Sequence, residues 1–164
     1  HTVAQILLTG EDVGDVTRRK NFENTMCRLL ELSVIPIINE NDSISYHGIK
    51  FGGNDTLAAL VALLSDADLL INLSDIDGLY DADPHTHPDA KLIPTVTAIT
   101  DEVLALAGGA GTKLGTGGMA TKLRAAKMVT AAGCDMIIAN GEKPTYLYDI
   151  VDGKAVGTRF LGKK

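Results

Sequence analysis

The stretch that decides the fold is "NDTLAALVALLSDADLLINLSD", residues 54–75. Its first part places apolar side chains at the spacing of one helix face, namely Leu57, Leu60, Val61 and Leu64. Residues 68–73 then form a short apolar run that is typical of a buried strand. A helix followed directly by a buried strand is the repeating unit of an α/β protein.

The same alternation extends in both directions along the chain. Apolar runs predict strands at residues 3–8, 34–39 and 136–140. Helical spacing predicts helices at residues 17–32, 54–67, 99–108 and 118–133. Residues 146–160 are expected to form two short strands around the turn pair Asp152-Gly153. We therefore predict an α/β fold with a mainly parallel sheet that helices cover on both faces.

Composition excludes several classes of function. The 164 residues are 45% hydrophobic and 22% charged, which is ordinary for a globular domain. A net charge of −6 without Lys/Arg clusters argues against nucleic acid as a partner. No apolar run is long enough to span a membrane. Cys27 and Cys134 lie far apart without metal-site spacing, so we expect two thiols and a cytoplasmic location.

Polar residues follow three of the predicted strands, as Glu40-Asn41-Asp42, Ser74-Asp75 and Asn140-Gly141. Ligands of open α/β sheets bind beyond the carboxyl ends of the strands. Any strand must leave the core somewhere, so a single polar end is weak evidence. Residues 74–94 add a long irregular segment, and such segments are usually functional.

A glycine-rich turn, "GTGGMATK" at residues 115–122, precedes another predicted helix. It does not follow a buried strand, as a dinucleotide fingerprint should, and it lacks the Gly-Lys-Ser/Thr of a P-loop. Backbone amides at a helix start, together with Lys122, still form a suitable site for an anion. "KFGGNDTLAAL" at residues 50–60 repeats this geometry, with Asn54 or Asp55 as the expected helix cap and the other facing a ligand.

Five motifs occur in an order that resembles the amino acid kinase family: "INENDSIS" (38–45), "FGGNDTLAALVA" (51–62), "LSDIDGLYDADP" (73–84), "GTGGMATK" (115–122) and "VGTRF" (156–160). The first and fourth together resemble the members that phosphorylate L-glutamate. The resemblance implies a three-layer αβα sandwich and the ATP-dependent conversion of the γ-carboxylate of L-glutamate to L-glutamyl 5-phosphate, the first step of proline biosynthesis. It also implies Mg²⁺ held mainly by phosphate and water, a homo-oligomer (dimer or tetramer), and proline as a possible feedback inhibitor.

The resemblance assigns roles residue by residue. It implies catalytic roles for Lys122 and Asp55, the latter as the carboxylate that organises lysine. It implies substrate contacts by Asp42, Asn54, Asn39 and Lys50. It implies nucleotide contacts by Ser74, Asp75, Tyr80, Thr116, Gly117, Gly118, Met119, Ala120, Thr121 and Lys122. No protein side chain is assigned to a metal, and we expect His85 and His87 to lie in a solvated loop.

The resemblance also implies that residues 1–164 are the C-terminal, nucleotide-binding portion of a kinase domain, with part of the glutamate site. A second catalytic lysine and a second glycine-rich turn would then lie outside them, so this portion alone is expected to be inactive. Gly53 stands where the family usually has an acidic residue. The alternatives are another member of the family, such as an acetylglutamate or nucleoside monophosphate kinase, or a nucleotide-binding module without catalysis.

Overall fold

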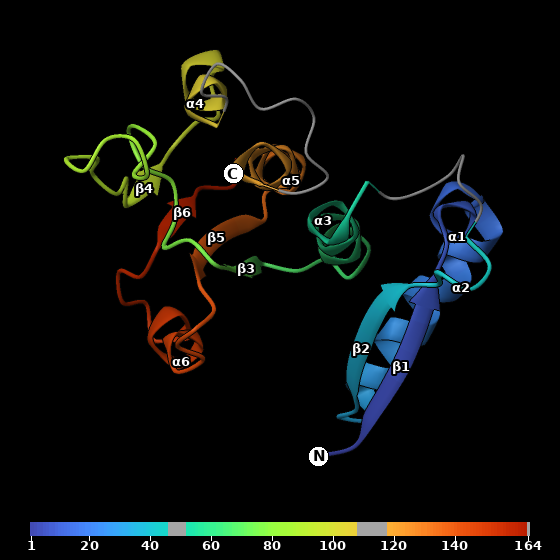
Figure 1. Cartoon of the computed structure of the whole chain (residues 1–164). Coiled ribbons are helices and arrows are strands. Elements are labelled where there is room, and N and C mark those ends of the chain that lie inside the picture. Colours follow the sequence, from blue (N-terminus) through green and yellow to red (C-terminus); the bar gives the residue numbers. More distant parts are fainter. Residues whose placement is uncertain (46–51, 108–117, 164) are drawn as a thin grey trace.

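The computed structural model describes residues 1–45, 52–107 and 118–163. Strands and helices alternate along most of the chain, as predicted (Figure 1). The elements are β1 (Val3–Leu8), α1 (Gly10–Gly14), α2 (Val16–Glu31), β2 (Ile35–Glu40), α3 (Asn54–Leu64), β3 (Leu69–Ser74), β4 (Thr95–Val96), α4 (Asp101–Leu106), α5 (Met119–Ala131), β5 (Asp135–Asn140), α6 (Tyr146–Val151) and β6 (Thr158–Phe160).

The strands of the described residues form two sheets rather than one. β1 pairs with β2, and the other sheet has the order β3-β5-β6-β4. The pairs β1–β2, β3–β5 and β4–β6 are parallel, and β5–β6 is antiparallel. The predicted α/β class with mainly parallel pairing is therefore confirmed, although the strands of the described residues do not join into a single sheet.

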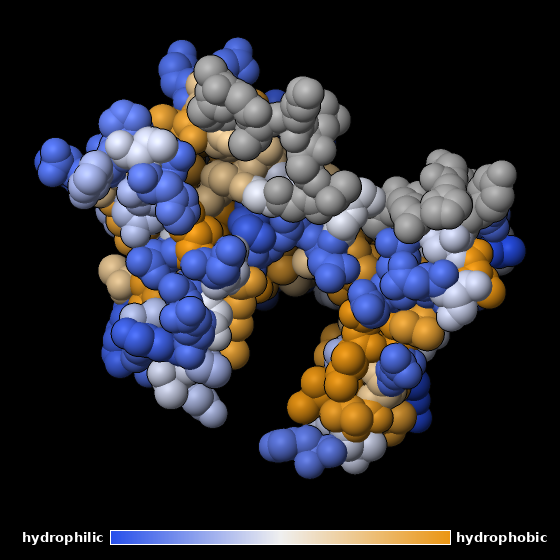
Figure 2. Space-filling model, in the orientation of Figure 1, coloured by the Kyte–Doolittle hydropathy of each residue, from blue (hydrophilic) through white to orange (hydrophobic). Residues whose placement is uncertain are grey.

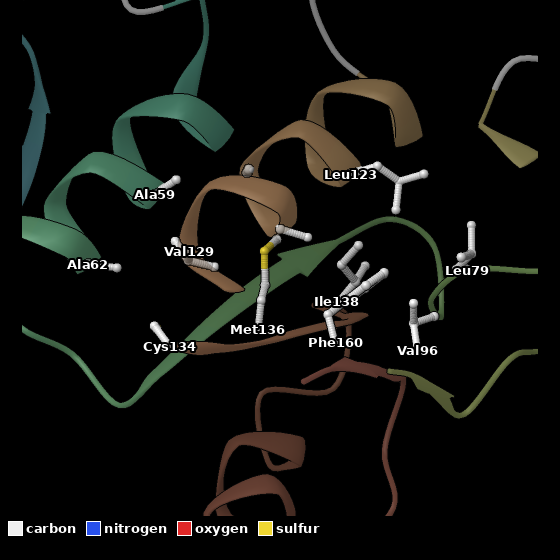
Figure 3. Packing of buried hydrophobic residues seen from close by; sticks show 12 residues of the cluster. Ala59, Ala62, Leu79, Val96, Leu123, Val129, Cys134, Met136, Ile138 and Phe160 are labelled. Atoms are coloured by element: carbon white, nitrogen blue, oxygen red, sulfur yellow. The ribbon is translucent and has the colours of Figure 1, made fainter. Parts of the chain in front are cut away.

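The larger sheet lies between two layers of helices. Along β5, Met136 and Ile138 belong to the main core cluster, which α3 and α5 cover (Figure 3). The alternate residues Ile137 and Ala139 cluster instead with Ile150 of α6. This alternation follows from the two-residue period of a strand, and it gives the sheet its two covered faces.

The smaller sheet is covered differently. Phe22 and Met26 of α2 form a second core cluster with Leu8 of β1 and Leu57 of α3. The opposite face is open, and Ile37 at its centre is 54% exposed. In the described part of the chain, the expected cover on both faces is thus found only for the larger sheet.

A notch separates the two sheets below α3 (Figure 2). It contains a cavity of about 460 Å³ that reaches from β2, at Ile38, to β3, at Leu70. Most of its lining is apolar, and α3 connects the two sides through its contacts with both core clusters.

Of the two strands predicted within residues 146–160, the second is found as β6. The first is wrong, because residues 146–151 form α6. The β-branched and aromatic side chains of "YLYDIV" favour a strand locally, but burial of Ile150 against the sheet favours a helix. Gly153 follows the helix with φ of 80°, as glycines after helix ends often do. The strand β4 and the short helix α1 were not predicted.

The long segment between β3 and β4 is attached to the core by its own buried Leu79 and by hydrogen bonds to the buried Thr158. Thr158 on β6 accepts a hydrogen bond from the amide of Leu79 at 2.8 Å. Its hydroxyl donates to the carbonyl of Ile93 at 2.6 Å. Tyr80, next to Leu79, forms an isolated bridge with Leu92 and lies near Ser74 and Asn140, the last residues of β3 and β5.

Candidate nucleotide and acceptor site

The start of α3 is built on glycine rather than on a side-chain cap. Gly53 is the N-cap, with φ of 107°, and no side chain caps the helix. The expectation that Asn54 or Asp55 caps α3 is therefore wrong. A positive φ favours glycine, which gives a physical reason for Gly53 at this position. Both polar side chains are free for other contacts.

Asp55 is the centre of the site. Its Oδ1 accepts hydrogen bonds from Lys122 Nζ at 3.0 Å and from Asn72 Nδ2 at 2.7 Å. Its Oδ2 accepts from the hydroxyl of Thr121 at 2.6 Å. The side chains of Lys122 and Asp55 are only 13% and 15% exposed. The two residues predicted to be catalytic therefore form an ion pair that is largely shielded from water.

The electrostatics of Asp55 favour its charged form. Burial raises the pKa of this carboxyl, but the hydrogen bonds from Thr121, Asn72 and Lys122 and the positive charge of Lys122 lower it more. The net pKa lies below the ordinary value of 3.8. Asp55 is consequently a carboxylate at neutral pH, and its negative charge lies beside Nζ of Lys122.

A cleft of about 360 Å³ lies beside this ion pair, between the carboxyl ends of β3 and β5 and the start of α5. Six of the residues predicted to contact the nucleotide line it, namely Ser74, Asp75, Tyr80, Gly118, Met119 and Lys122. Within the cleft, Ser74 donates its hydroxyl hydrogen to Asp75 at 2.9 Å, which lowers the pKa of Asp75.

Gly118 joins the cleft to α5. It is the N-cap of the helix and has φ of 136°, which a side chain rarely adopts. A Cβ atom at this position would have no heavy atom of the described residues within 4 Å. The glycine is thus required by the backbone conformation and not by crowding, and it leaves the helix start open towards the cleft.

Five residues of the cleft wall were not among the predicted ligand contacts. Asp77 accepts hydrogen bonds from Asn140 Nδ2 at 2.9 Å and from the Tyr80 hydroxyl at 3.1 Å. Ile76, Pro84 and His85 also line this wall. The motif at residues 73–84 and the polar end of β5 were the sequence signals for this group. His85, predicted to be merely solvated, is exposed but lies in the lining of the cleft.

The predicted substrate contacts are brought together in part. Asn39 at the end of β2 and Asn54 at the start of α3 both line the 460 Å³ cavity. Asp42 lies in the exposed turn after β2 and is not among the lining residues of either cavity. Lys50 lies outside the described residues.

The other residues predicted to contact the nucleotide are not among the described residues that line the cleft. Thr116 and Gly117 lie outside the described residues, and Ala120 is exposed on α5. Thr121 is buried, and its hydroxyl is directed to Asp55. In the described ranges no group of three or more possible metal ligands occurs. No helix of these ranges has the length and apolarity that crossing a membrane requires.

The α/β fold and the motifs that build the cleft are shared with known proteins. Residues 1–140 match the amino acid kinase family, and the chain belongs to that family. Among solved structures, a UMP kinase from Bacillus anthracis has a TM-score of 0.60 at 15% identity, covering 89% of this chain and 52% of that one. An isopentenyl phosphate kinase has a TM-score of 0.58 at 21% identity, with 83% and 49% covered. These likenesses confirm the fold.

Curated relatives are more similar in sequence. The glutamate 5-kinase of Clostridium tetani (strain Massachusetts / E88) is 55% identical over 97% of this chain and 60% of its own length. That of Clostridium perfringens (strain 13 / Type A) is 52% identical, with 100% and 62% covered. That of Deinococcus radiodurans is 53% identical, with 96% and 44% covered. The chain thus spans about half of the length of these relatives.

Proposed function

We propose that residues 1–164 form the nucleotide-binding portion, and part of the acceptor site, of a kinase that phosphorylates the γ-carboxylate of L-glutamate with ATP. The product is L-glutamyl 5-phosphate, and the reaction is the first step of proline biosynthesis. The observation that carries the proposal is the largely shielded ion pair between Asp55 and Lys122, the latter lining the cleft. The identity to glutamate 5-kinases supports glutamate as the acceptor.

The chemistry that this site must perform is mainly charge stabilisation. Phosphoryl transfer requires an in-line approach and positive groups around the transferred phosphoryl. Lys122 supplies an ammonium, and the start of α5 adds the partial positive charge of a helix N-terminus. A carboxylate acceptor is already a nucleophile, so the reaction needs no general base.

The start of α3 divides the site between donor and acceptor. Asp55 faces Lys122 and the cleft side, whereas its neighbour Asn54 lines the larger cavity together with Asn39. Only this polar end of the cavity suits a charged amino acid, because most of the remaining lining is apolar. We therefore place ATP in the 360 Å³ cleft and glutamate near Asn39 and Asn54.

Mg²⁺ accompanies ATP in this proposal and would neutralise charge on the phosphates. Mg²⁺ at nucleotide sites keeps several waters and uses one or two carboxylates besides phosphate oxygens. Asp75 and Asp77 both line the cleft and fit that donor set. The dimer or tetramer, proline inhibition and cytoplasmic location expected from the family are part of the same proposal.

The test uses a chimeric kinase in which residues 1–164 replace the matched region of the C. tetani enzyme, to which they are 55% identical. We expect glutamate-dependent ADP release and an acyl phosphate that hydroxylamine traps as a hydroxamate. N-acetylglutamate and UMP serve as competing acceptors, which separates the alternative family members. ATP binding to the chimera without transfer to any of the three acceptors would instead support a non-catalytic nucleotide-binding module.

A further inference from the structure

Asn72 is a polar residue in the middle of the otherwise apolar strand β3. It is only 8% exposed. Its Nδ2 donates to Oδ1 of Asp55 at 2.7 Å, the same oxygen that Lys122 contacts at 3.0 Å. The amide thus lies behind the ion pair, on the side of the sheet.

The other half of this amide is not satisfied. Among the described residues, Oδ1 of Asn72 is buried without a hydrogen-bond partner. Such an orphaned acceptor destabilises a folded protein, and an apolar side chain of the same shape avoids the loss. The contact with Asp55 is therefore what an asparagine adds at this position over an apolar side chain.

We propose that Asn72 is a positioning residue, which fixes the carboxylate of Asp55 so that Oδ1 presents to Lys122. Three donors from β3 and α5 hold the carboxylate from separate directions: Asn72, Thr121 and Lys122. Without Asn72, the Asp55 side chain keeps its link to Thr121 but can turn about it. The Lys122 ammonium then loses its fixed place beside the cleft. The catalytic meaning of this role rests on the proposed function.

The contact between Asn72 and Asp55 can be measured through the pKa of Asp55, because few groups of the described residues surround this carboxyl. Lys122 of α5 is the charged group that contacts it, while Asn72 of β3 and Thr121 of α5 are neutral donors. Loss of one donor to the ionised form raises the pKa of a carboxyl. The titration of Asp55 therefore reports directly on the contact with Asn72.

The experiment compares Asn72→Leu with Thr130→Val in the 164-residue chain. Thr130 is also buried in the same part of the fold, but its hydroxyl bonds Ala126 within α5. We expect a ¹³C-detected titration of Asp55 to move to higher pH in Asn72→Leu and to stay unchanged in Thr130→Val. ATP affinity should fall about threefold to tenfold in Asn72→Leu alone, the range for loss of one hydrogen bond.

Each outcome decides a separate point. An unchanged Asp55 titration would show that Asn72 does not hold the carboxylate, and so would overturn the proposal. A shifted titration with unchanged ATP affinity would overturn the positioning of Lys122. If the wild-type chain binds no ATP, the proposed function loses its support, whereas the titration still decides the role of Asn72. Asn72→Ser, which is too short to reach Asp55, replaces Asn72→Leu if that variant does not fold.

Discussion

The hydroxyl of Thr121 donates to Oδ2 of Asp55 across 2.6 Å and so connects the first turn of α5 to the first turn of α3. The next residue, Lys122, bonds the other oxygen of the same carboxylate. Two consecutive residues therefore hold both oxygens, and the placement of α5 on α3 fixes where the ammonium lies. A substitution of Asp55, Thr121 or Lys122 should therefore displace or remove the ammonium group of Lys122.

Lys122→Ala should lower kcat of the chimeric kinase by about 10²–10³, the usual effect of losing one charge-stabilising donor. The glutamate KM and the fold should change little, because the lysine is assigned to the phosphates. Steady-state kinetics and circular dichroism measure these quantities. Lys127→Ala is the control, since Lys127 is exposed on the same helix. A Lys122→Ala variant that keeps more than half of the wild-type kcat would remove Lys122 from the mechanism.

Asp55 should make folding stability depend on pH. Its folded-state pKa is below the ordinary value of 3.8, so its contribution is present above that value and is lost as the pH falls through the folded-state pKa. Asp55→Asn should thus lower the free energy of unfolding at pH 7 by about 1–3 kcal/mol. Urea titrations at pH 7 and pH 3 should show a smaller difference at the lower pH. Asp89→Asn, at an exposed site, should show no such dependence, and an equal difference at both pH values would contradict the assignment.

The sequence predicted most of this fold because burial and local spacing agree. Residues 54–75 form a helix and a strand in the fold as their pattern indicates. Residues 146–151 were mistaken for a strand because packing of Ile150 against the sheet overrides local preference there. The bond from Asn72 to Asp55 joins residues 17 positions apart. The only sign of this hydrogen bond in the sequence was the presence of an asparagine within an apolar run.

Asp42→Ala should raise the glutamate KM of the chimeric kinase far more than its ATP KM. The family resemblance implies that Asp42 pairs with the substrate ammonium, and we expect such a charge-assisted hydrogen bond to contribute about 1.5–3 kcal/mol. Asp42 lies in the turn that directly follows β2, the strand that carries Asn39. Ser43→Ala, in the same exposed turn, is the control. A rise in the ATP KM instead would mean that the two substrate positions are reversed.

Gly118→Ala should weaken ATP binding by imposing a side chain on a backbone with φ of 136°. Such strain costs about 1–3 kcal/mol, and the start of α5 can relieve it only by moving away from the cleft. Gly153→Ala is a matched control, because Gly153 also has a positive φ, of 80°, and also has open space around its Cβ position. Both variants should lose stability in urea titrations. Only Gly118→Ala should lose ATP affinity in calorimetry, and equal affinities would show that the cleft does not depend on Gly118.

Residues 1–164 alone should phosphorylate glutamate far more slowly than a full-length relative. Of the described residues that line the cleft, Lys122 is the single lysine or arginine, so the transferred phosphoryl group is balanced on one side only. Each further donor that is lacking costs about 2.7–4 kcal/mol of barrier. The open face of the β1–β2 sheet should also make the chain marginally stable. Glutamate-dependent ADP release, measured beside the C. tetani enzyme with circular dichroism to verify folding, decides the matter: turnover within tenfold of that enzyme would mean that all essential groups lie within these residues.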